Sequence, residues 1–331
     1  MRERPAGSAI AMMPIRPRVV FMGTPEFAVP SLRELAHGCD VVGVITQPDR
    51  PSGRGRKPLG SQVAQAAERL GLRVVKPETM KSHELVAEIT DLKPDLFAVV
   101  AFGAILTPEW LDVPRLGAIN LHGSLLPEYR GASPVQRALW DGKCGTGVTT
   151  IWMDEGIDTG DYILQRWAPI HSEDTAGTLA LRLAELGAPL LAESVALAAR
   201  EQAPRTKQPQ AGSYAKKLAK RDGIVDFGAD AVTVWNRQRA VTPWPGATTG
   251  YDSRRLQIME SKPYDVLPAA AAPGTVLELM GRGVRVACGV GSLELLRVKP
   301  EGGVEMDAID WARGARIARG ARVHWNEEAT T

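Results

Sequence analysis

Short apolar runs alternate with amphipathic helical patterns over the first 200 residues of this 331-residue chain. The candidate strands are Arg18–Met22, Val41–Thr46, Arg73–Val75, Asp95–Phe102, Gly117–Leu121, Gly147–Met153 and Tyr162–Ile170. The candidate helices are Glu26–Ala36, Ser61–Leu70, Ser82–Leu92, Pro134–Trp140 and Thr175–Glu201. This order predicts an α/β fold with a mostly parallel, Rossmann-type sheet covered by helices on both faces, and such sheets bind ligands at the carboxyl ends of their strands.

The pattern changes after the stretch QAPRTKQPQAGS (Gln202–Ser213), which is polar, holds two prolines and shows no periodicity. Its composition indicates a linker. Beyond a predicted helix near Asp230–Ala240 come four β-like runs separated by Gly and Pro, namely RRLQIME, GTVLELM, GVRVACG and SLELLRV. Short strands at this spacing predict a second, smaller domain built as a β-barrel.

Charge and cysteine content narrow the classes of function. The net charge is +2, but residues 205–331 carry 19 Lys and Arg against 14 Asp and Glu, while residues 1–204 carry 21 against 24. A basic second half indicates a polyanionic partner, although unequal solvated surfaces explain the same numbers. Three separated cysteines form neither a disulfide framework nor a metal knuckle, so we expect a cytoplasmic protein. The apolar runs are too short for a membrane span, and we expect residues 1–17 to be a loose extension.

One predicted strand ends in the sequence INLHGSLLPEYRG (Ile119–Gly131), which places Asn120 and His122 two residues apart. In an extended chain these two side chains project to the same side of the sheet. A lone histidine is more often a hydrogen-bonded packing residue. Here an amide shares its face at a strand end, where a buried imidazole without a task would be costly. The pair therefore indicates a site.

A second predicted strand ends in MDEGIDTGD (Met153–Asp161), with three aspartates, Asp154, Asp158 and Asp161. Such a segment is also typical of a plain turn or a cation site, although its spacing is not that of an EF-hand loop. An amide, an imidazole and a carboxylate on neighbouring strand ends could perform acyl transfer without a protein nucleophile. The N–H groups would hold a developing oxyanion, and the carboxylate would orient the imidazole and handle the proton.

Several stretches resemble the folate-dependent formyltransferase family, and within it the enzymes whose acceptor is methionyl-tRNA. They are INLHGSLLPEYRGASPVQRALWDG, GVTTIWMDEGIDTGD, GTPEFA, TQPDRPSGRGRKP and PWPGA, and together they span most of the chain from Arg18 onward. The resemblance implies a catalytic domain over residues 18–202, a linker over 203–220 and an OB-fold-like tRNA-binding domain over 221–331. It also implies transfer of a formyl group from 10-formyltetrahydrofolate to the α-amino group of methionine on initiator tRNA. Apart from the resemblance, we expect a monomer that binds no membrane.

The same resemblance assigns roles to individual residues. Asn120, His122 and Asp158 would be catalytic, and no metal is expected in their site. The expected folate pocket is formed by Ser124, Leu125, Leu126 and Pro127. One departure is Glu128, where members of the family more often carry Lys or Arg.

A basic loop follows the second predicted strand, with the expected tRNA contacts Arg50, Arg54, Arg56 and Lys57. A solvated flexible loop has the same composition, but a basic loop beside a strand end could fold onto RNA when RNA arrives. Two other functions stay open from the residues alone. One is a formyl-folate enzyme with a small amine acceptor, and the other is a non-enzymatic RNA- or nucleotide-binding module.

Overall fold

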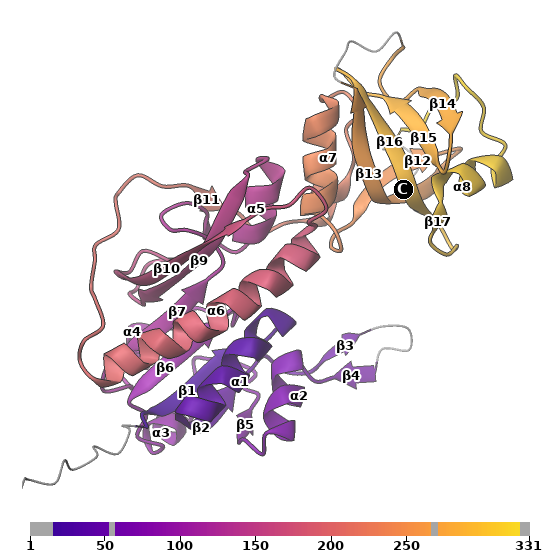
Figure 1. Ribbon diagram of the computed structural model, residues 1–331. Coiled ribbons are helices and arrows are strands. Elements are labelled where there is room, and N and C mark those ends of the chain that lie inside the picture. The colour runs from indigo at the N-terminus through magenta and orange to yellow at the C-terminus, as the bar shows by residue number, and fades with distance from the viewer. Residues whose placement is uncertain (1–15, 53–56, 266–270, 325–331) are drawn as a thin grey trace, which may run out of the picture.

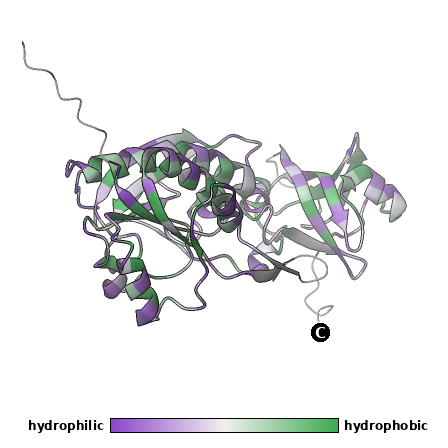
Figure 2. Cartoon of the chain, turned by 90° about the horizontal axis from the view of Figure 1, so that it is seen from below, coloured by the Kyte–Doolittle hydropathy of each residue, from purple (hydrophilic) through white to green (hydrophobic). Residues whose placement is uncertain are grey.

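The computed structural model describes residues 16–52, 57–265 and 271–324. It contains two domains placed end to end, each with its own hydrophobic core (Figure 1). Figure 2 shows hydrophobic residues concentrated in the strands of the N-terminal sheet and on the inward sides of its helices. No helix in the described part of the chain combines the length and apolar character needed to cross a bilayer.

The N-terminal domain is built on a seven-stranded sheet with the order β10-β9-β7-β6-β1-β2-β5. Its strands are β1 Arg18–Gly23, β2 Asp40–Ile45, β5 Val74–Val75, β6 Leu96–Val100, β7 Ala118–His122, β9 Gly145–Trp152 and β10 Tyr162–Pro169. The five strands from β7 to β5 run parallel, whereas β9 is antiparallel to both of its neighbours. The predicted α/β class with a mostly parallel sheet is confirmed.

Helices cover both faces of this sheet. They are α1 Val29–Gly38, α2 Gln62–Arg69, α3 His83–Thr90, α4 Pro108–Leu111, α5 Pro134–Trp140 and α6 Ala176–Ala199, with a 3₁₀ turn η1 at Glu26–Ala28. Helices α1, α2 and α6 pack on one face and α3 and α4 on the other. Three helices start where a hydroxyl side chain accepts a bond from the third residue of the first turn, which is the usual N-cap arrangement. These caps are Ser61, Ser82 and Thr175.

Two short pairings lie outside the main sheet. Strands β3 (Arg50–Ser52) and β4 (Lys57–Leu59) pair antiparallel within the segment that the sequence predicts to be a basic loop. Strand β8 (Arg130–Gly131) pairs in parallel with β11 (Tyr214–Ala215), which belongs to the linker. The linker therefore packs on the N-terminal domain instead of spanning open solvent.

The C-terminal domain is an antiparallel sheet with the order β12-β13-β16-β15-β14, and β17 pairs with β16. Its elements are η2 Lys220–Gly223, α7 Ala231–Ala240, β12 Ala247–Tyr251, β13 Arg254–Asp265, β14 Val276–Met280, β15 Gly283–Ala287, β16 Ser292–Pro300, β17 Met306–Asp307 and α8 Ala308–Gly314. Register shifts interrupt the β13–β16 ladder, and such bulges bend a strand. In the described residues β12 and β14 remain the two ends of the order, as in a partly open barrel.

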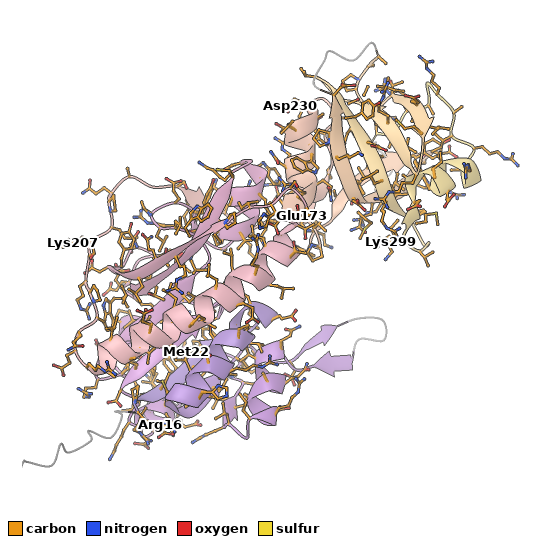
Figure 3. The ribbon with its side chains drawn as sticks, viewed as in Figure 1. Arg16, Met22, Glu173, Lys207, Asp230 and Lys299 are labelled. Carbon is orange, nitrogen blue, oxygen red and sulfur yellow. The ribbon has the colours of Figure 1, made fainter. Side chains whose placement is uncertain are left out.

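The junction between the domains is formed by α7, which packs against α5 (Figure 1). Arg239 of α7 donates to the backbone oxygens of His171 (3.1 Å) and Asp174 (3.3 Å) just before α6, and its guanidinium stacks on Trp235. Glu173, labelled in Figure 3, marks this junction, whereas Lys207 lies on the linker at the far side of the N-terminal domain. Burial lowers the pKa of Arg239, and the nearby Asp174 carboxylate opposes that shift.

Candidate active site

Strand β7 presents Asn120 and His122 on one face of the sheet, as the sequence predicts. The residues between and before them, Leu121 and Ile119, point the other way into the core against α6. Asn120 is partly buried and the His122 side chain is only 6% exposed. The alternation of period two in an extended strand is the direct cause of this arrangement.

The His122 ring is fixed by a backbone carbonyl. Its Nε2 atom lies 2.9 Å from the oxygen of Tyr129, and a carbonyl can only accept, so Nε2 carries a proton. The other ring nitrogen, Nδ1, faces Asp158 at 3.5 Å from Oδ2. Nδ1 is therefore the atom of this ring that is available to gain, hold or release a proton.

Asp158 joins the pair from the turn between β9 and β10. Its Oδ1 accepts from Asn120 Nδ2 at 3.3 Å, and its Oδ2 accepts from the backbone N–H of Gly131 at 2.8 Å. The carboxylate side chain is 16% exposed. The structure thus brings together the three side chains that the sequence singled out.

The path by which Asp158 arrives differs from the prediction of neighbouring strand ends. Because β9 runs antiparallel to β7, the carboxyl end of β9 lies beside the start of β7, where Met153 N donates to Ala118 O at 2.8 Å. The turn 153–161 folds back over the strand to reach His122. Asp158 completes this fold with a φ of +55°, a left-handed conformation that aspartate tolerates better than most residues.

The other two aspartates of this turn have structural tasks. Asp154 Oδ1 accepts from Gly156 N (3.0 Å) and Thr159 Oγ1 (2.7 Å), which is the geometry of an Asx turn. The backbone oxygen of Asp161 accepts from Trp152 N at 2.9 Å. The plain-turn interpretation thus describes Asp154, while Asp158 alone points at the histidine.

The expected folate-pocket segment Ser124–Pro127 forms the bend after β7. Ser124 is fully buried, and its hydroxyl donates to Glu128 O at 2.5 Å. Leu126 is 3% exposed, so its side chain belongs to the interior. Leu125 and Pro127 are partly exposed, and Leu125 lies over Gly147 of β9. Within this segment the more exposed side chains are therefore those of Leu125 and Pro127.

Residues that sequence reasoning missed hold this bend in place. Thr149 Oγ1 donates to Ser124 O (2.7 Å) and accepts from Leu126 N (3.1 Å), and Gln165 Nε2 donates to both Thr149 Oγ1 (3.0 Å) and Leu126 O (2.8 Å). No local signal marks these two residues, because they come from β9 and β10. Only the antiparallel pairing of those strands places them here.

The expected tRNA contacts are placed only in part. Arg50 and Lys57 begin β3 and β4, for which the backbone is described, and Arg54 and Arg56 lie outside the described residues. Glu128, the departure noted in the sequence, is exposed and accepts from the linker hydroxyl of Ser213 at 2.7 Å. It therefore ties the linker to the bend after β7.

Both domains match known protein families. Residues 18–195 match the formyl transferase family model, and residues 217–316 match the model of the formyl transferase C-terminal domain. The methionyl-tRNA formyltransferase of Symbiobacterium thermophilum is 45% identical over 92% of this chain and 94% of its own length. That of Heliobacterium modesticaldum is 47% identical over 92% of this chain and 99% of its own.

Solved structures share the fold at much lower identity. HypX from Aquifex aeolicus in complex with tetrahydrofolic acid has a TM-score of 0.60 at 18% identity, and covers 90% of this chain and 47% of its own. An N-formyltransferase from Helicobacter canadensis, in complex with folinic acid and dTDP-3-aminofucose, has a TM-score of 0.60 at 19% identity, with coverages of 84% and 98%. Matches across both domains at more than 40% identity show that the chain is a one-carbon-group transferase and belongs to the methionyl-tRNA formyltransferase family.

Proposed function

We propose that this enzyme transfers the formyl group of 10-formyltetrahydrofolate to the α-amino group of methionine on initiator methionyl-tRNA. The observation that carries the proposal is the convergence of Asn120, His122 and Asp158 on one face of β7. Asn120, His122 and Asp158 are the catalytic residues in this proposal, and residues 18–202, 203–220 and 221–331 act as catalytic domain, linker and tRNA-binding domain.

The chemistry follows from the donors on β7. The methionine amine attacks the formyl carbon, a new C–N bond forms, and the carbonyl oxygen becomes an oxyanion. Asn120 Nδ2 and a protonated His122 Nδ1 are N–H donors on one face of a strand, and such preorganised donors stabilise charge that develops in the transition state. The bond from the formyl carbon to N10 of the folate then breaks, and N10 takes up the proton that the amine has lost.

Asp158 has two tasks in this scheme. Its carboxylate faces Nδ1 at 3.5 Å and stabilises the imidazolium by its charge, which leaves the Nδ1 proton for the oxyanion. In this proposal it also accepts the proton that leaves the amine and passes it on to N10, as a general base does. No protein nucleophile is needed, since the amine itself attacks.

The donor is expected to lie against the bend after β7. Leu125→Ala should mainly weaken binding of the folate, because Leu125 is partly exposed. Leu126→Ala should cost about 2–5 kcal/mol of unfolding free energy, because Leu126 is buried. Measuring the thermal midpoint together with folate binding separates the two roles. A Leu125 variant with parent-like folate affinity would remove Leu125 from the pocket.

The acceptor is tested by supplying 10-formyltetrahydrofolate with charged initiator tRNA, uncharged tRNA or a small amine, and asking which becomes formylated. Formylation of charged tRNA alone supports the proposal, and a preference for the small amine contradicts it. The Asp158→Asn variant serves as the matched blank. Because initiator tRNA acts in translation, we expect the enzyme in the cytoplasm. We also expect it to be a monomer.

The basic loop gives a second test of the acceptor. Each phosphate contact releases counterions, so log affinity should fall with log salt by about 0.7–0.9 per contact. Replacing Arg54, Arg56 and Lys57 together, with Arg50 retained, should flatten this slope and raise KM for tRNA while leaving folate binding unchanged. If the triple variant formylates charged tRNA like the parent across a salt series, the loop has no part in tRNA binding.

A further inference from the structure

The turn that carries Asp158 is held by contacts from the catalytic domain and also by contacts from the linker. Asp158 has a φ of +55°, and a non-glycine residue in the left-handed region is held there by its surroundings. Its carboxylate is bonded to Gly131 N and Asn120, but these contacts fix only the side chain. Bonds to the Asp154 carboxylate hold the first half of the turn, and the backbone carbonyl of Asp158 itself accepts a bond from the linker.

Gln208 of the linker makes that contact. Its Nε2 donates to the backbone oxygens of both Asp158 (2.9 Å) and Gly160 (2.7 Å). Its Oε1 accepts from Arg130 Nη2 (2.8 Å) and Nε (3.1 Å). Carbonyls only accept and a guanidinium only donates, so the amide can face only one way. The Gln208 side chain thus forms hydrogen bonds to both ends of the segment 158–160.

The linker reaches this point in a fixed register. On one side of Gln208, Thr206 exchanges backbone bonds with Tyr162 at 2.8 and 3.2 Å, and Pro204 O accepts from Trp152 Nε1 at 3.0 Å. On the other side, Ser213 O accepts from Arg130 N at 2.9 Å, and β11 pairs with β8. Because the linker is held on both sides, the position of the Gln208 amide is set by the backbone.

We propose that Gln208 is a positioning residue for formyl transfer, which acts through Asp158 by fixing the turn that aims its carboxylate at His122 Nδ1. The interdomain linker is then a wall of the active site as well as a connection. This inference rests on the proposed function of Asp158. It predicts that a substitution of Gln208 lowers the rate of the chemical step without weakening the binding of the folate or of the tRNA.

The test compares Gln208→Glu with Gln210→Glu in the full chain. Both variants add one negative charge to the linker, but Gln210 is exposed and has no side-chain hydrogen bond in the described part of the chain. A glutamate at 208 can still meet Arg130, yet it cannot donate to the two carbonyls. Gln208→Met has similar length and no charge, so it removes the donor without repulsion. Each variant is assayed for kcat, for both KM values and for its thermal midpoint.

We expect Gln208→Glu and Gln208→Met to lower kcat by about 10–100-fold, the scale of a small misplacement of a reacting group, with both KM values near those of the parent. Gln210→Glu should keep the parent kcat. In an Asp158→Asn background, Gln208→Met should cause little further loss, because residues that act as a unit are not additive.

Parent-like kcat in both Gln208 variants overturns the inference. The inference is also overturned if Gln208→Met lowers kcat by the same factor in the parent and in the Asp158→Asn background. In that case the linker affects kcat independently of the Asp158 carboxylate. If instead the parent enzyme fails to formylate charged initiator tRNA, the proposed function is wrong, and the two failures are distinguished by the parent alone.

Discussion

Two histidines in the described part of this chain face a carboxylate, and their surroundings differ in nearly every respect. His83 at the start of α3 lies 2.8 Å from Glu109 Oε1, and the two side chains are 84% and 47% exposed. His122 on β7 lies 3.5 Å from Asp158 Oδ2, with side chains 6% and 16% exposed. The closer pair is on the surface and the looser pair is in the candidate site.

The comparison shows that the distance between a histidine and a carboxylate does not by itself indicate whether the pair has a role in catalysis. Glu109 raises the pKa of His83 by a hydrogen bond and by its charge, but water screens an exposed pair and leaves it little net energy. The buried pair has its second ring nitrogen engaged by Tyr129 and its carboxylate engaged by Gly131. What distinguishes His122 is that the bond from Nε2 to Tyr129 O fixes the direction in which Nδ1 points.

The largest effect is expected from the buried pair itself. Either His122→Ala or Asn120→Ala should lower kcat by roughly 10²–10³-fold, the range for one lost donor in a preorganised site. Asp158→Asn should be at least as damaging, because it removes the charge that holds the imidazolium. Steady-state formylation of charged tRNA measures this.

The matched control is His83→Ala, in which the closer pair is lost. Its kcat should equal that of the parent, and the thermal midpoint of each variant is measured so that a loss of kcat is not mistaken for a loss of folding. A folded His122→Ala enzyme with near-parent kcat would remove His122 from the mechanism and would make the two pairs equivalent.

The next effect comes from the backbone that holds the buried pair. Gly131 has a φ of +104°, and a Cβ there would lie 2.8 Å from the Tyr214 ring and 2.9 Å from Ala215 O. Gly131→Ala should therefore cost roughly 1–3 kcal/mol of unfolding free energy and also lower kcat, because the N–H that binds Asp158 must move. Thermal unfolding and kcat are measured on the same preparation.

Gly71, with a φ of +68° and open space around it, supplies the control. Gly71→Ala meets left-handed backbone strain without a close contact and far from the site in the sequence, so it should lose some stability and keep kcat. If Gly131→Ala also loses stability alone, the Gly131 N–H does not position Asp158.

How much of this site the sequence predicts depends on the range of each contact. The shared face of Asn120 and His122 follows from the local period of a strand and is predicted correctly. The route of Asp158 is not, because the antiparallel pairing of β9 with β7 is set by non-local hydrogen bonds. The role of Gln208 could not be predicted either, because its contacts with the turn are also non-local. A polar residue in a linker without periodicity gives no sign that its amide meets a turn 50 positions earlier.

A smaller effect is expected at Tyr129, whose carbonyl, not its hydroxyl, fixes His122. The hydroxyl donates to Asp141 Oδ2 at 2.8 Å, and burial and this bond raise the pKa of Tyr129, so it stays a proton donor. Tyr129→Phe should cost about 1–2 kcal/mol of unfolding free energy and leave kcat unchanged. A large loss of kcat without loss of stability would show that the side chain, and not the backbone, orients the imidazole.

The smallest effect is expected from the exposed pair, and it should depend on pH. The folded pKa of His83 is raised by Glu109, so the pair stabilises the fold below the unfolded value of about 6.5. That contribution is lost as the pH rises through the folded pKa. His83→Gln should therefore lower the thermal midpoint slightly at pH 5.5 and not at pH 8.5, and a pH series of thermal scans on parent and variant measures it.

Glu109→Gln provides the partner control, because it removes the same pair from the other side. Both variants should show the same small difference on the acid side, and the double variant should add nothing, since the pair can be lost only once. Because His83 is exposed and makes no contact with Asn120, His122 or Asp158 in the described residues, kcat should be unchanged at both pH values. A midpoint difference that grows toward alkaline pH would have the opposite sign, and it would show that Glu109 does not raise the pKa of His83 in the folded protein.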